Sequence, residues 1–203
     1  MSVDQQSGVG PWVIRSSITT VVFAVLCAAV ALHFTTQIDI GLYDETAYLQ
    51  RGAAIDTEGM PTADMAPLYS LWYRSLQVVV ADPVQRYYVQ YGLTIALLPL
   101  GLFLLFRQLG TTLTASLLSG LFILCSTLNV LNWPRVSAFT LLVMIVGLLL
   151  FLRSPCRDRG WAYLFATTSI CIFLRPEFAL SLACIGLWWG FGRGLRVASL
   201  VTV

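Results

Sequence analysis

Two adjacent acidic residues, Asp44 and Glu45, stand in a polar segment that follows the first apolar stretch of the chain. A carboxylate can act as a general base when it lies within hydrogen-bond reach of the proton of a hydroxyl or amine. Neighbouring residues of a helix point about 100° apart, so the two carboxylates cannot both face one cavity. We expect one to act as the base and the other to be structural. A wholly structural alternative stays open, in which Asp44 caps a surface helix and Glu45 complements its dipole.

A second pair of opposite charges, Arg175 and Glu177, flanks Pro176 between two apolar stretches at residues 161–174 and 178–191. Each stretch has about 14 residues, which gives roughly 21 Å of helix at 1.5 Å per residue. That is shorter than the hydrocarbon core of a bilayer. The turn is therefore predicted to lie below the outer membrane surface, where both charges need a polar cavity or each other. The alternative is a tight turn with Arg175 snorkelling outward.

A third candidate is Arg135, which follows a polar turn at residues 129–134. An arginine between two apolar stretches is typical of an interfacial anchor, and that is the favoured interpretation. Contact with an anionic lipid headgroup is the alternative. No glycine-rich phosphate loop and no set of Ser, His and Asp residues is present in the sequence.

The composition of the chain indicates the class of protein in which these candidate residues lie. The 203 residues are 58% hydrophobic and only 11% charged, and the mean hydropathy is +0.80. Soluble domains have about 45–50% apolar and about 25% charged residues. This excess of apolar residues excludes a soluble enzyme, a disordered chain and a nucleic-acid-binding domain. The five cysteines lack C-x-x-C spacing and His33 is the only histidine, so we predict neither a disulfide framework nor a metal site built from cysteine and histidine.

The apolar stretches predict an all-α, polytopic transmembrane bundle, since about 20 apolar residues cross a bilayer as a helix. A cleaved signal peptide is the competing interpretation of the first stretch. A seventh apolar run begins before Val203. The six predicted spans cover residues 17–34, 88–106, 111–131, 136–152, 161–174 and 178–191.

The charges predict the orientation of the bundle. If the spans alternate, seven arginines fall on one side and seven acidic residues fall on the other. By the positive-inside rule, the N-terminus is then cytoplasmic and the acidic loop lies outside. The arginines are Arg15, Arg107, Arg153, Arg157, Arg159, Arg193 and Arg196, and the acidic residues are Asp39, Asp44, Glu45, Asp56, Glu58, Asp64 and Asp82.

The outer loop at residues 35–87 is too long to lack structure of its own. Apolar residues recur at helical spacing from Leu68 to Val79, with Pro67 in the first turn, which predicts an amphipathic juxtamembrane helix with interfacial aromatics. A second short helix is predicted over residues 44–55. Asp82 and the following proline suit the start of the next span, and the tyrosines after them suit an aromatic belt.

The whole arrangement resembles the GT-C class of membrane glycosyltransferases, which includes protein O-mannosyltransferases and bacterial aminoarabinose transferases. Asp44 and Glu45 with Tyr48 look like the acidic motif of the first outer loop in that class. The segment Ala-Pro-Leu-Tyr at residues 66–69 is similar to its Pro-Pro-Leu-Tyr segment. The segment Arg-Pro-Glu at residues 175–177 looks like one found at an outer helix tip in bacterial members.

The resemblance implies transfer of a sugar from a polyprenyl phosphate to an acceptor glycan, lipid or protein on the outer face of a bacterial inner membrane. Asp44 is then the base, with Glu45 second, and Arg175 and Arg135 hold the phosphate. Glu177, Tyr48 and Tyr69 complete the substrate site. No cofactor beyond the lipid-linked donor is required, and a divalent metal bound by the acidic pair stays open. The expected partners are this donor and membrane lipids, without nucleic acid.

The chain departs from the class in two respects. The first proline of the Pro-Pro pair is Ala66 here. Members are also usually longer, so residues 1–203 are expected to form one incomplete GT-C-like module: a fragment, a truncated product or an inactive relative. Two other functions stay open. One is a transporter or flippase for a lipid-linked or polar substrate, and the other is a non-catalytic membrane subunit.

Overall fold

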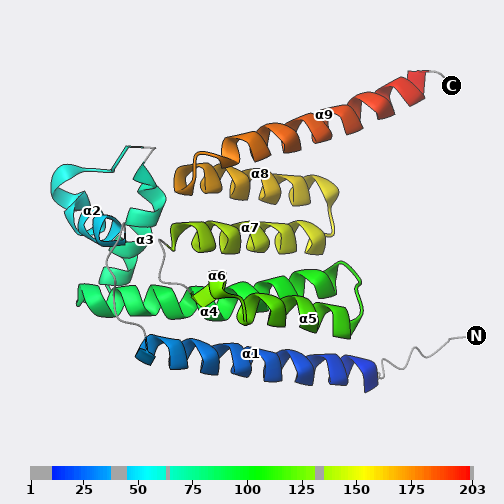
Figure 1. Cartoon of the computed structure of the whole chain (residues 1–203). Helices are drawn as coiled ribbons and strands as arrows, with labels where there is room; N and C mark the ends of the chain where they lie inside the picture. The colour runs from blue at the N-terminus through cyan, green and yellow to red at the C-terminus, as the bar shows by residue number, and fades with distance from the viewer. Residues whose placement is uncertain (1–10, 38–44, 63–64, 131–134, 202–203) are drawn as a thin grey trace, which may run out of the picture.

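The computed structural model describes residues 11–37, 45–62, 65–130 and 135–201, and within these ranges every regular element is a helix. The long helices lie side by side and alternate in direction, whereas α2 and α3 stack at one end of the row (Figure 1). The helices are α1 (Pro11–Gln37), α2 (Glu45–Glu58), α3 (Pro67–Gln77), α4 (Pro83–Gln108), α5 (Leu113–Leu124), α6 (Thr127–Val130), α7 (Val136–Arg153), α8 (Arg157–Leu174) and α9 (Phe178–Val201).

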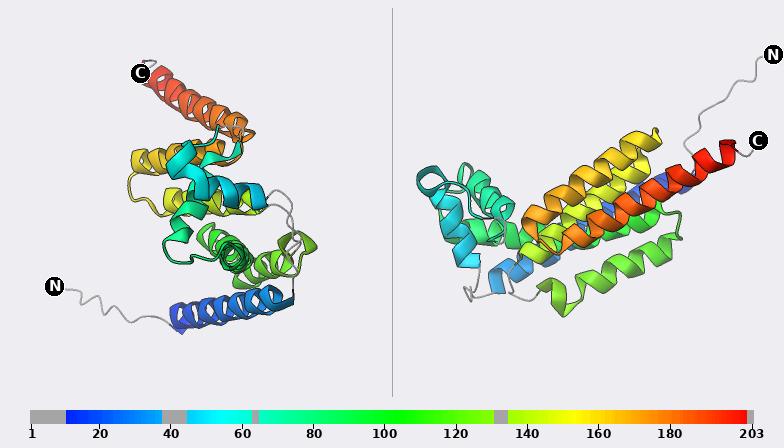
Figure 2. Two further views of the ribbon diagram at one scale, coloured as in Figure 1. Left: turned by 90° about the vertical axis from the view of Figure 1, so that its left-hand side faces the viewer. Right: turned by 90° about the horizontal axis from the view of Figure 1, so that it is seen from above.

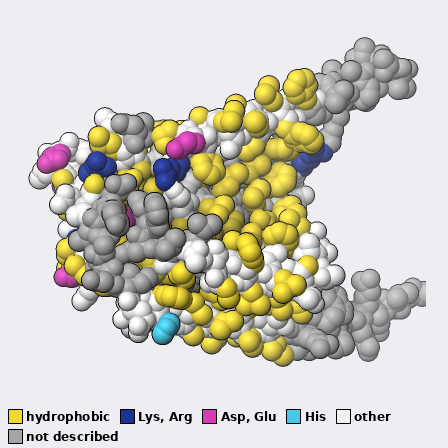
Figure 3. Space-filling model, viewed as in Figure 1, with side chains coloured by type: hydrophobic (Ala, Val, Ile, Leu, Met, Phe, Trp, Pro, Cys, Tyr) yellow, Lys and Arg dark blue, Asp and Glu magenta, His cyan; other side chains and the backbone are white. Residues whose placement is uncertain are grey.

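Packing follows the order of the row. Helix α4 is central and contacts α1, α5 and α7, and α7 in turn packs on α8. Helix α9 contacts α8 and then diverges from the row (Figure 2). Hydrophobic side chains cover much of the row, and the acidic side chains visible on this face lie at the end of the row that carries α2 and α3 (Figure 3). A row of helices with an apolar outer surface and one polar end is typical of a membrane protein.

Three of the described helices are long and apolar enough to cross a membrane: residues Ser17–Gln37 of α1, α4 and α7. They correspond to the first, second and fourth predicted spans. The other predicted spans are also helical, but they differ from the predictions in length and polarity.

The third predicted span, residues 111–131, is wrong as one continuous helix. Helix α5 ends at Leu124 after 12 residues, and the separate turn α6 follows. The break falls at Ser126, whose backbone N–H turns back to the Ile123 carbonyl, and the Asn129 N–H bonds to the Ser126 carbonyl. Serine, threonine and asparagine side chains compete with the helical backbone for hydrogen bonds, which favours such breaks.

The predicted shortness of the last two spans also needs correction. Helix α8 has 18 residues and α9 has 24, about 27 Å and about 36 Å at 1.5 Å per residue. Helix α8 begins with Arg157, Asp158 and Arg159, so its helical backbone extends beyond the apolar stretch. Both helices are thus longer than their apolar stretches, and the depth of the turn at Pro176 in a membrane stays a prediction.

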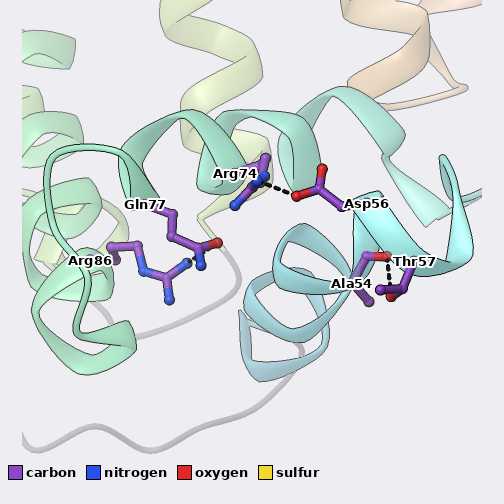
Figure 4. Close-up of polar contacts among 6 residues, drawn as sticks. All are labelled: Ala54, Asp56, Thr57, Arg74, Gln77 and Arg86. Carbon is purple, nitrogen blue, oxygen red and sulfur yellow. Dashed lines mark hydrogen bonds and ion pairs between the residues drawn. The ribbon is translucent and has the colours of Figure 1, made fainter.

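Helices α2 and α3 form at the two places predicted between residues 35 and 87, and they pack tightly on each other. A Cβ atom at Gly52 would lie 2.7 Å from the Ser70 carbonyl oxygen, so only glycine permits this approach. An ion pair between Arg74 and Asp56 joins the exposed sides of the two helices (Figure 4).

The interfacial role predicted for the aromatic residues of α3 is wrong for Tyr69 and Tyr73, which are fully buried. The apolar residues Leu71 and Val79 are exposed instead. The same correction applies to the predicted aromatic belt of α4, because Tyr87 and Tyr91 are buried. Aromatic residues near a helix end suit a membrane interface or a packed core equally well, since each has an apolar body and a polar tip.

Candidate functional site

Glu45, the first residue of α2, is buried with only 3% of its surface exposed. Its carboxylate accepts a hydrogen bond from the Tyr73 hydroxyl at 2.5 Å and a shared one from the Tyr69 hydroxyl at 3.1 Å to each oxygen. The backbone N–H of Arg135 donates to its Oε1 atom. Three donors from two distant segments thus converge on one carboxylate, which is the arrangement that a buried charge requires.

The two tyrosines reach Glu45 because they lie four residues apart on α3, on one face of the helix. Pro67 starts this helix, as predicted. The residue before it, Ala66, has a positive φ of 49°. A proline is locked near −65° and could not adopt this conformation. The Ala-Pro sequence at residues 66 and 67 therefore permits a backbone here that a Pro-Pro pair would forbid.

A buried glutamine extends the cluster, and the sequence analysis missed it. The Trp72 indole N–H donates to Gln90 Oε1 at 2.5 Å, and Gln90 Nε2 donates to the Tyr69 hydroxyl at 3.4 Å. Gln90 and Thr94 are fully buried and lie four residues apart on α4. Polar residues spaced along one face of an apolar helix are the signal that could have identified them.

Arg135, predicted to be an interfacial anchor, is instead buried with 2% of its surface exposed. Its guanidinium carbon lies 4.2 Å from the centre of the Tyr91 ring, within the range of a cation–π contact. Its Nη1 atom donates to the Asn129 carbonyl at 2.7 Å, whereas Nε and Nη2 have no partner in the described part of the chain. The anchor interpretation is wrong because the arginine finds both an aromatic face and a carbonyl inside the protein.

Burial dominates the electrostatics of this cluster. Desolvation raises the pKa of Glu45, although the bonds from Tyr73, Arg135 and Tyr69 oppose that shift. Desolvation also raises the pKa values of Tyr69 and Tyr73 well above the ordinary value and lowers that of Arg135. The tyrosines are therefore neutral donors. A carboxylate whose oxygens are occupied by such donors is better suited to fix α2 in place than to accept a substrate proton.

Arg175 follows the last residue of α8 and is more accessible, with 38% of its side chain exposed. Its Nη2 atom donates to the Ser137 hydroxyl, and its Nη1 atom lies 3.8 Å from Glu177 Oε1. The Glu177 side chain is 72% exposed. Part of the guanidinium fork thus remains available for an anion, such as a phosphate.

The start of α7 connects the two charged groups. Arg135 contacts Glu45 through its backbone, and Ser137, two residues later, contacts Arg175. Val136 between them belongs to the same apolar core as Tyr69 and Leu174. The structure therefore brings the acidic segment at the start of α2 and the Arg-Pro-Glu segment to one end of the helix row. We call this combination the α7 junction: Glu45, Arg135, Ser137 and Arg175.

An apolar groove runs beside the α7 junction, between α3, α7 and α8. Its volume is about 320 Å³. Trp72 and Phe139 stack in its wall with ring centres 5.3 Å apart, and Leu174, which directly precedes Arg175 in the sequence, also lines it. The other lining residues are Leu68, Leu71, Ser75, Val143 and Ile170. A groove of this kind can hold a hydrocarbon chain whose anionic end lies near the guanidinium.

The remaining predicted site residues are placed as follows. The Tyr48 ring packs edge-on against Tyr69 with centres 5.1 Å apart, and the Arg51 guanidinium lies 5.8 Å from the Tyr48 ring centre. Asp44 lies outside the described residues. Among those that are described, no group of three or more His, Cys, Asp and Glu residues could hold a metal ion.

These features define a helical membrane protein that carries a buried polar cluster and a half-exposed arginine at one end. In comparisons with known proteins, no family model, no curated protein and no solved structure matches the chain.

Proposed function

We propose that the protein is a membrane-embedded glycosyltransferase of the GT-C type. It transfers a sugar from a polyprenyl-phosphate donor to an acceptor on the outer face of a bacterial inner membrane. The observation that carries this proposal is the α7 junction, which joins the acidic segment to Arg175 beside an apolar groove. Three parts of the sequence on which the resemblance rests, the acidic segment, Tyr69 and Arg175, lie around the start of one helix.

The proposed donor site follows from the chemistry of the leaving group, a phosphate on a long hydrocarbon chain. Such a group needs a cation to stabilise its developing negative charge and an apolar surface for its chain. Arg175 supplies a planar fork for the phosphate, and the groove that Leu174 helps to line receives the first part of the chain. Arg135 and Tyr69 face protein groups, so we assign them to positioning rather than to direct contact with the substrate.

The proposed base is Asp44, with Glu45 as its positioning residue. Glu45 is held by three donors, so its place at the start of α2 is fixed. Asp44 directly precedes it in the sequence. Because Glu45 is held by these bonds, we assign to Asp44 the role of the base that accepts the proton of the acceptor.

The proposed membrane arrangement has six spans: α1, α4, α5 together with α6, α7, α8 and α9. The ends of α4 and α7 and the start of α8, which carry Arg107, Arg153 and Arg157, lie at the end of the row away from α2 (Figure 1). An arginine-rich end is expected on the cytoplasmic side. We therefore place α2, α3 and the α7 junction outside, and the N-terminus inside.

The proposed role of Arg175 can be tested with purified protein and a panel of polyprenyl-phosphate sugars, by measuring release of polyprenyl phosphate. Arg175→Lys keeps the charge but loses the fork, so release should fall roughly tenfold, the effect of one charge-assisted hydrogen bond. Arg175→Ala should lower it further. Arg159→Ala, which removes an exposed arginine at the other end of α8, is the matched control and should leave release unchanged. Equal release by Arg175→Ala and the control would refute the phosphate site, and no release from any donor would argue against the enzyme.

The proposed orientation predicts the labelling of single cysteines in intact cells. Thr57→Cys at the exposed end of α2 should react with a membrane-impermeant thiol reagent, whereas Asp158→Cys at the start of α8 should react only after lysis. The exposed native residues Cys125, Cys156 and Cys184 are first replaced by serine. Labelling of Asp158→Cys in intact cells, with Thr57→Cys protected, would reverse the topology and place the proposed site in the cytoplasm.

A further inference from the structure

A second cavity lies between α2 and the beginning of α4, and the proposed transfer reaction does not use it. Its volume is about 320 Å³. Leu49, Gln50 and Ala53 of α2 line one wall, and Val84, Arg86 and Tyr87 of α4 line the other. None of these residues lines the groove beside Arg175. The cavity is therefore a separate space.

Among the described residues that line this cavity, Arg86 alone carries a charge, and it is 4% exposed. Its Nη2 atom donates to the Ala81 carbonyl at 3.2 Å. Its Nη1 atom donates to Gln77 Oε1 at 3.4 Å (Figure 4). Its Nε atom has no partner, and Arg86 forms no ion pair with any carboxylate that the structure describes.

A guanidinium in such surroundings is costly unless an anion compensates its charge. The nearest acidic residue in the sequence, Asp82, is exposed and accepts from the Gln85 backbone N–H at 2.8 Å as the cap of α4. The Gln77 and Ala81 oxygens accept hydrogen bonds from the Arg86 guanidinium, but both oxygens are neutral and do not compensate its positive charge. The cavity thus combines apolar walls with one buried positive charge, for which no described carboxylate supplies the counter-ion.

We propose that this cavity binds a single-chain amphiphile with one anionic head group, a carboxylate or a phosphate, which pairs with Arg86. The apolar side chains of Leu49, Ala53 and Val84 receive the hydrocarbon chain. Ligand pockets span about 300–1,000 Å³, so a cavity at the lower end of that range suits one chain rather than the two chains of a phospholipid. This inference is independent of the transferase proposal.

The proposal is tested by ligand binding to the purified protein in an uncharged detergent, measured by native mass spectrometry. The probes are dodecanoate, dodecyl phosphate and the uncharged dodecanol. At least one of the two anions should bind roughly tenfold or more tightly than dodecanol, as expected for a hydrogen bond to a charged group. Preference for one anion identifies a fatty acid or a phosphate ester as the natural class of ligand. Dodecanol binding as tightly as both anions would overturn the proposal.

Two matched variants on α2 locate the bound chain. Ala53→Trp places a large ring at the cavity, whereas Ala54→Trp places the same ring one position along, on a residue that does not line it. Anion binding should fall at least roughly tenfold with Ala53→Trp and stay unchanged with Ala54→Trp. Equal binding by both variants would exclude this cavity. Arg86→Gln should remove the preference for anions over dodecanol, and the Ala53 variant keeps the test decisive if Arg86→Gln does not fold.

Discussion

Replacing Asp44 with asparagine is expected to lower sugar transfer by about 10²–10⁴-fold, the usual contribution of a positioned general base. Asparagine keeps the size of the side chain and is nearly as good a helix cap as aspartate. The protein should therefore express and fold as before, and only the proton acceptor is lost. The measurement is release of polyprenyl phosphate from the donor panel in the presence of acceptor.

A matched control for this variant is Asp56→Asn, which also neutralises one acidic residue near α2. Asp56 lies at the exposed end of the helix and pairs with Arg74. Exposed ion pairs contribute about 0–1 kcal/mol to stability, so this variant should retain full activity. Unchanged transfer in Asp44→Asn would restrict Asp44 to a capping role, and the catalytic assignment would fail.

The second large effect is expected at Glu45, on stability rather than on chemistry. Glu45→Ala leaves the Tyr73 hydroxyl, the Tyr69 hydroxyl and the Arg135 N–H buried without their acceptor. Each unsatisfied buried donor costs about 1–3 kcal/mol, so a loss of about 3 kcal/mol or more is expected. The unfolding midpoint of the protein in detergent measures this loss. Glu58→Ala, at the exposed end of α2, should change stability by no more than about 0.5 kcal/mol.

A double substitution separates this network from general damage to α2. Tyr73→Phe removes one donor, so Glu45→Ala should destabilise the Tyr73→Phe protein less than it destabilises the original protein. Residues that share a hydrogen-bond network give such non-additive effects. Strict additivity would show that the carboxylate and the hydroxyl do not interact, which would contradict the buried cluster.

Helix starts were the part of the fold that the sequence predicted best, because they depend on local chemistry. Pro67 begins α3, and Asp82 caps α4 by accepting from the Gln85 N–H. The end of α5 was missed because a high apolar content conceals a break at Ser126. The lengths of α8 and α9 were missed because apolar stretches mark what is buried in lipid or protein, not where backbone hydrogen bonding stops.

The composition of the candidate site was only partly predictable. The sequence identified two adjacent acidic residues, but which of them turns inward depends on tyrosines 24 and 28 residues away. Arg135 was interpreted as an anchor because a lipid headgroup and a buried aromatic ring attract arginine in the same way. The Tyr91 ring that decides between them lies on α4, far away in the sequence. Such choices depend on tertiary contacts.

The bond between Glu45 and the Arg135 backbone also constrains how the protein is made. The two residues are separated by 90 positions. At about 5–20 residues per second, a ribosome needs roughly 5–18 s to synthesise that length. Tyr69 and Tyr73 are 24 and 28 residues away, so for the later part of this interval Glu45 can meet both hydroxyls but not its third donor. Until then the carboxylate between α2 and α3 is only partly satisfied, and the synthesis of the start of α7 supplies the last donor that this buried group needs.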